Sequence, residues 1–64
     1  MEAWTGQLVS KMHINGIKAQ DAAREAGISD SYFSLILSGK RNPPDMRERM
    51  EAAVDRILEK RKNI

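Results

Sequence analysis

Few side chains of this sequence could carry out covalent or metal chemistry. The 64 residues contain no cysteine and a single histidine, His13. A thiolate nucleophile, a cysteine-based metal site and a zinc site built from imidazoles alone are therefore excluded. No nucleophile and base stand at a characteristic spacing, and the glycines do not gather in a phosphate-binding loop. We expect a protein that is not an enzyme and that takes no cofactor, metal or small-molecule ligand.

The remaining polar side chains suit contact with a polyanion. Short hydroxyls occur at Ser31, Ser34 and Ser38. Cations stand at Lys18 and in the pair Lys40-Arg41. Hydroxyls can donate to or accept from base edges and phosphates, while Lys and Arg neutralise phosphates. The formal net charge is only +2, which permits a nucleic-acid partner without requiring one.

Glycine and proline divide the chain into four segments. The breaks are Asn15-Gly16, Gly27, and the stretch from Gly39 to Pro44. Apolar residues between the breaks recur every three or four positions, which is the period of a helix. We therefore predict one all-α domain over residues 1–64, with four helices and no sheet. The apolar face of the first helix comprises Trp4, Leu8 and Met12.

The second and third segments are predicted to meet at a tight turn. Alanines form a stripe along the second helix, so that another helix can approach it closely. Gly27 relieves a positive φ in the turn, and Ser29 caps the third helix. Phe33, with Ile36 and Leu37, is expected to face the core. This pattern is typical of a helix-turn-helix, here over about 18–38, whose second helix can enter a DNA major groove.

The fourth segment predicts one long helix over about 44–60. Its first half, to Ala53, is expected to pack on the first helix and on Leu37. Its second half, Val54 to Leu58, is expected to have fewer partners within the chain and to contribute to a homodimer. On the charged face, Arg47 with Glu51 and Glu59 with Lys62 stand at the spacing of helical ion pairs.

The order of these features resembles a known family. The matching stretches are Ala22-Ala23, Gly27-Ile28-Ser29, Ser31-Tyr32-Phe33-Ser34, and Ser38 through Pro44. From Ile17 to Pro44 the chain is similar to the Cro/λ-repressor-like (Xre) helix-turn-helix domains, and to small prophage-type members in particular. The resemblance implies a sequence-specific transcriptional regulator that binds double-stranded DNA. The family usually begins its second helix with Thr-Gln, where this chain has Lys18-Ala19, and Gln20 stands one position later.

Helical geometry then assigns candidate DNA contacts. With Phe33 and Ile36 facing inward, an outward row remains on the third helix. Its members are candidates for base contacts, and they are Ser31, Ser34, Leu35 and Ser38. The leucine can pack on a thymine methyl. Candidates for phosphate contacts are Lys18, Gln20, Tyr32, Lys40 and Arg41. Without the resemblance, these serines and cations would be an ordinary solvated surface.

Two functions from different classes follow. The first is a DNA-binding regulator, of phage- or prophage-repressor type, acting as a dimer on a nearly palindromic site. The alternative is a protein-interaction module, such as an antirepressor, that uses the helical scaffold without touching DNA. The charge balance favours this alternative, because residues 1–45 hold five basic and five acidic side chains. The N-terminus has no signal-peptide pattern and no apolar stretch is long enough for a membrane, so we expect a cytoplasmic protein.

Overall fold

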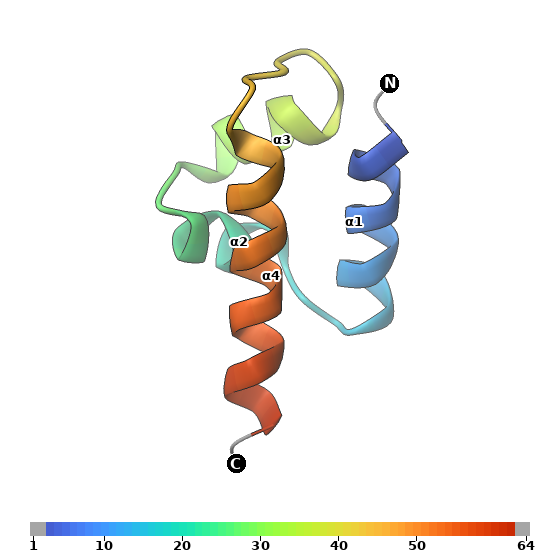
Figure 1. Ribbon diagram of the computed structural model, residues 1–64, viewed down its shortest axis with the longest axis vertical. Helices are drawn as coiled ribbons and strands as arrows, with labels where there is room; N and C mark the ends of the chain where they lie inside the picture. Colours follow the sequence, from blue (N-terminus) through green and yellow to red (C-terminus); the bar gives the residue numbers. More distant parts are fainter. Residues whose placement is uncertain (1–2, 63–64) are drawn as a thin grey trace.

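The computed structural model describes residues 3–62. These residues form α1 (Ala3–Ile14), α2 (Ala19–Ala26), α3 (Asp30–Leu37) and α4 (Met46–Lys62), with no strand among them (Figure 1). The predicted all-α architecture of four helices is confirmed. Figure 1 shows α4 running along the length of the molecule, with α1 on one side, α2 behind it and to the other side, and α3 crossing behind its upper end toward α1.

The turn between α2 and α3 has the expected geometry. Gly27 is left-handed, with a φ of +79°. Its N–H donates to the carbonyl of Arg24 at 3.1 Å, and the N–H of Ile28 donates to that of Ala23 at 3.0 Å. The Ser29 hydroxyl accepts from the N–H of Tyr32 at 3.1 Å. Each helix end is thus closed by the residue predicted to close it, which fixes where α3 begins.

The end of α3 is closed in a similar way. Gly39 has a φ of +85°, and its N–H donates to the carbonyl of Ile36 at 3.1 Å. The N–H of Lys40 then donates to the carbonyl of Leu35 at 3.0 Å. The first basic residue after α3 is therefore held against the helix end by its own backbone.

The long helix begins later and ends later than predicted. Residues 44–45 form a turn, and the N–H of Met46 donates to the carbonyl of Pro43 at 3.3 Å, so that α4 starts at Met46 rather than Pro44. Pro44 keeps Pro43 out of the helical conformation, which delays the start of the helix. At the other end, α4 continues to Lys62.

One core joins all four helices. α4 packs chiefly against α2 and also contacts α1. α3 packs against α2 and α1. The alanine stripe of α2 is buried, as are Phe33 and Ile36 of α3. Leu37 is half-buried and packs against this core. The core members are Trp4, Leu8, Met12, Ile17, Ala22, Ala23, Phe33, Ile36, Met46, Met50 and Val54.

The expectation that the segment from Val54 to Leu58 has fewer partners within the chain is wrong for Val54. Val54 has an exposed fraction of 0%, while Ile57 and Leu58 are half-buried and pack against the core. The reason is that α2 and α1 both reach beyond the middle of α4. Arg56 of α4 pairs with Glu25 of α2 at 3.0 Å, and Lys11 of α1 pairs with Asp55 at 2.6 Å.

Candidate nucleic-acid interface

The outward row of α3 lies on the surface, with one difference from the prediction. Ser31, Ser34 and Ser38 are exposed. Leu35 is half-buried rather than pointing freely into solvent. Its carbonyl accepts from the backbone N–H groups of Lys40 and Arg41. The Ser38 hydroxyl donates to that same carbonyl at 3.0 Å. Ser31 and Ser34 therefore keep both donor and acceptor capacity, and Ser38 keeps only its acceptor capacity.

The residues predicted to contact phosphate flank this row. Lys18 occupies the position before α2, in extended conformation, and its side chain caps nothing. Gln20 is exposed in the first turn of α2, and Lys40 and Arg41 are exposed directly after α3. Tyr32 differs, because it is half-buried and packs against the core. Its ring serves first as packing, and only its phenolic end is suited to a phosphate.

Arg24 and Asp30, which were not selected from the sequence, line a hollow beside the turn between α2 and α3. The hollow has a volume of about 330 Å³ and is lined by Gln20, Arg24, Ile28 and Asp30. It brings an amide, a guanidinium and a carboxylate to one place. The spacing of Gln20 and Arg24, four residues apart on one helix, could have indicated that they share a face. The position of Asp30 beside them depends on the turn itself, and it places a negative charge next to Arg24.

The basic side chains of α1 and α4 differ from those around α2 and α3 in whether they are paired within the chain. In α1 and α4, six of them bind partners within the chain. Arg49 and Arg61 bind the backbone carbonyls of Ala26 and Asn15. The other four form ion pairs, and they are Lys11 with Asp55, Arg47 with Glu51, and Arg56 and Lys60 with Glu25.

Around the helix-turn-helix the cations are unpaired. Within residues 3–62, the side chains of Lys18, Arg24, Lys40 and Arg41 form no ion pair with an acidic group. None of these four side chains donates a hydrogen bond to another described residue. Among the lysines and arginines of residues 3–62, the side chain of Lys62 at the end of α4 also has neither an ion pair nor a hydrogen bond. Four of five unpaired cations thus stand on or beside α2 and α3, which is the distribution a phosphate-contacting surface requires.

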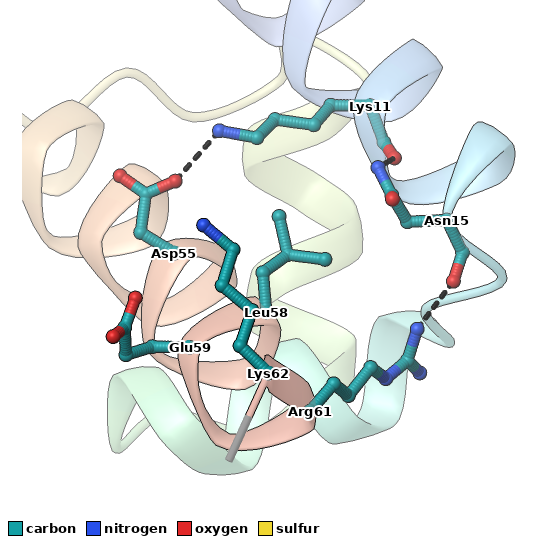
Figure 2. A pocket seen from close by; sticks show the side chains of 7 residues that line it. All are labelled: Lys11, Asn15, Asp55, Leu58, Glu59, Arg61 and Lys62. Carbon is teal, nitrogen blue, oxygen red and sulfur yellow. Dashed lines mark hydrogen bonds and ion pairs between the residues drawn. The ribbon is translucent and has the colours of Figure 1, made fainter. Parts of the chain in front are cut away.

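A larger hollow lies elsewhere, between the end of α1 and the second half of α4. Its volume is about 590 Å³. Figure 2 shows the Lys11 ammonium reaching across it to Asp55, and the Arg61 guanidinium reaching to the carbonyl of Asn15, with Leu58 between them. Because Lys11 and Arg61 each bind a residue of the other helix or of the turn after it, the hollow is a seam that joins α1 to α4. It is lined by Lys11, Asn15, Asp55, Leu58, Glu59, Arg61 and Lys62.

Comparison of the chain with protein-family models, with curated proteins and with solved structures finds no match. None of the helices within residues 3–62 combines the length and the apolar character that crossing a membrane would need. What the protein does is therefore inferred from the residues and charges of α2, α3 and the turn that joins them.

Proposed function

We propose that this protein is a sequence-specific transcriptional regulator that binds double-stranded DNA in the cytoplasm, of the prophage-repressor type. The observation that carries the proposal is the placement of the unpaired cations. Lys18, Arg24, Lys40 and Arg41 surround α2 and α3, whereas the basic groups of α1 and α4, Lys62 apart, are bound within the chain. Asp21 and Asp30 are exposed acidic side chains of the same two helices, so the local excess of positive charge is +2 when the paired Glu25 is left out.

In the proposed complex α3 enters the major groove. Ser31 and Ser34 donate to or accept from base edges, and the exposed part of Leu35 packs on a thymine methyl. The small size of the serines lets the helix approach the base pairs closely. Lys18, Gln20 and Arg24, together with Lys40 and Arg41 beyond the other end of α3, contact phosphates and fix the orientation of the helix.

The complex we propose is a homodimer on a nearly palindromic site. One module of this size offers few base contacts, so two copies are needed for useful specificity. The half-buried Ile57 and Leu58 of α4 are the apolar residues we assign to a symmetric contact, although the exposed large apolar side chains within residues 3–62 are Val9 and Ile14 of α1. Such a dimer would separate the two α3 helices by about one turn of DNA, roughly 34–36 Å.

A protein-interaction module is the second candidate. The observation that favours it is Asp30, an exposed carboxylate at the first position of α3 beside Arg24. The outward row also contains no Arg, Lys, Asn or Gln, the residues that give bidentate contacts with bases. A carboxylate and a guanidinium beside small hydroxyls would suit a polar protein surface instead.

Selection from a random duplex library separates the two candidates. The proposal predicts enrichment of a site whose halves are related by a two-fold axis, and loss of enrichment for the double variant Lys40→Ala, Arg41→Ala. A matched control is Lys62→Ala, which removes an unpaired cation from the far end of α4. Recovery of random sequence from the wild-type protein would contradict the proposal and favour the interaction module.

A further inference from the structure

The last turn of α2 is completed by two arginines from α4. A helix leaves its last four carbonyls without intrahelical partners. In α2 the turn satisfies two of them, since the amides of Ile28 and Gly27 donate to the carbonyls of Ala23 and Arg24. The other two belong to Glu25 and Ala26. Arg56 Nη2 donates to the carbonyl of Glu25 at 2.8 Å, and Arg49 Nε donates to that of Ala26 at 2.7 Å.

Arg49 differs from the other α4 cations because it also contacts the turn itself. Its Nη2 lies 3.0 Å from the place that a Cβ on Gly27 would occupy. The guanidinium therefore lies beside Gly27, whose left-handed conformation reverses the chain between α2 and α3. Lys60, by contrast, binds only the carboxylate of Glu25, at 3.0 Å, and has no bond to the turn.

We infer that Arg49 is a positioning residue for DNA recognition, which holds the turn at Gly27 and so fixes the angle at which α4 and α2 present α3. The guanidinium is planar and carries several fixed donors, so one group can donate through Nε to the Ala26 carbonyl while its Nη2 stays beside Gly27. A lysine at this position supplies a point charge without that flat surface. This inference rests on the proposed function for its effect on DNA affinity.

The experiment compares Arg49→Ala, Arg49→Lys and Lys60→Ala with the wild-type protein. Binding to the selected duplex and to a random duplex is measured by fluorescence anisotropy, at a temperature where circular dichroism shows every variant folded. For Arg49→Ala we expect the affinity for the selected duplex to fall roughly tenfold, as a mismatched base pair would cause. Affinity for the random duplex and the salt slope should stay unchanged, because Arg49 contacts no phosphate.

The controls separate positioning from general stability and from direct DNA contact. Lys60→Ala removes a cation from the same α2–α4 contact and should keep the wild-type ratio of specific to random affinity. Arg49→Lys should recover only part of the lost ratio. An unchanged ratio in Arg49→Ala, an equal loss in Lys60→Ala, or a salt slope lowered by about one in Arg49→Ala would each overturn the inference.

A second readout does not involve DNA. Amide hydrogen exchange at Gly27 and Ile28, measured relative to amides in α1, should accelerate several-fold in Arg49→Ala and remain at the wild-type value in Lys60→Ala. Unchanged exchange at both residues would overturn the positioning role. If the wild-type protein selects no DNA sequence, the proposed function fails, and the exchange result alone decides whether Arg49 holds the turn.

Discussion

Arg56 binds Glu25 twice, through the carboxylate and through the backbone carbonyl of the same residue. Its Nε lies 3.0 Å from Oε1, and its Nη2 lies 2.8 Å from the carbonyl oxygen. Lys60 occupies the second carboxylate oxygen, also at 3.0 Å. One acidic side chain of α2 therefore ties two turns of α4 to the end of the helix that precedes the proposed recognition helix.

This contact predicts how stability depends on pH. The hydrogen bond from Lys60 and then that from Arg56 lower the pKa of Glu25. The unfolded chain therefore binds more protons at this residue than the folded one in the interval between the two pKa values. The contribution of Glu25 to stability is present above its unfolded pKa, near 4.3 for a glutamate, and is lost as the pH falls through the lower folded pKa.

The variant Glu25→Gln tests this dependence. Its midpoint of thermal unfolding should lie below that of the wild-type protein at pH 7, and the two midpoints should converge in acid. Glu59→Gln is the matched control, because the Glu59 carboxylate forms no ion pair with any residue of 3–62. Parallel curves for Glu25→Gln and the wild type over the whole range would mean that the contact does not form in solution.

Gly27→Val is expected to destabilise the protein by more than about 1 kcal/mol, because a side chain in the left-handed region carries a penalty of that size. The new side chain would also meet the Arg49 guanidinium, 3.0 Å from its Cβ. For a domain of this size the midpoint should fall by roughly 4–8 °C for each kcal/mol.

Gly6→Ala is the control for that substitution. Gly6 lies within α1, and a Cβ there would meet nothing within 4 Å. Alanine favours a helix interior over glycine by about 1 kcal/mol, so this variant should be more stable than the wild type. Equal midpoints for Gly27→Val and the wild-type protein would show that the turn has a different conformation.

Substitutions of residues that contact bases and of residues that contact phosphates should have different effects on DNA binding. Ser34→Ala or Leu35→Ala should change the preferred base at one position of the site, with an effect on the order of 1–3 kcal/mol. Arg41→Ala should instead weaken binding to all sequences alike and lower the salt slope by about one. The reverse pattern would mean that α3 faces DNA with another side.

The homodimer is tested by sedimentation equilibrium at protein concentrations on the order of tens of micromolar. We expect a dimer for the wild-type protein and a monomer for Ile57→Asp, because a buried carboxylate would oppose a symmetric apolar contact. Circular dichroism confirms that the variant is folded. A monomeric wild-type protein that occupies its DNA site as a single copy would contradict the dimer.

The local features of the fold could be predicted from the sequence because they depend on neighbours along the chain. Gly27 and Ser29 close their helix ends as expected. The Arg47–Glu51 ion pair also forms, at 3.6 Å, since residues four apart on a helix always lie close together. Local errors remain in α4, which starts later than predicted where two prolines follow each other and ends at Lys62. The Glu59–Lys62 ion pair expected from the same spacing does not form within residues 3–62.

The features that sequence reasoning missed depend on how helices cross. Arg49 and Ala26 are 23 residues apart, and Lys60 and Glu25 are 35 apart, so no periodicity relates them. Val54 is buried because α2 and α1 extend past the middle of α4, which a stripe of apolar residues on α4 alone does not reveal. For the same reason, the sequence could count the cations but could not tell which of them bind inside the chain.

The salt dependence of binding to the selected duplex measures whether the unpaired cations around α2 and α3 contact DNA phosphates. If the four unpaired cations around α2 and α3 each neutralise one phosphate, log K should fall linearly with log of the salt concentration, with a slope of about −3.6 per protomer. Substituting Lys18, Arg24, Lys40 and Arg41 together by alanine should bring the slope close to zero, while Lys62→Ala should leave it unchanged. Binding that is independent of salt, or a slope that survives removal of these four side chains, would contradict the account.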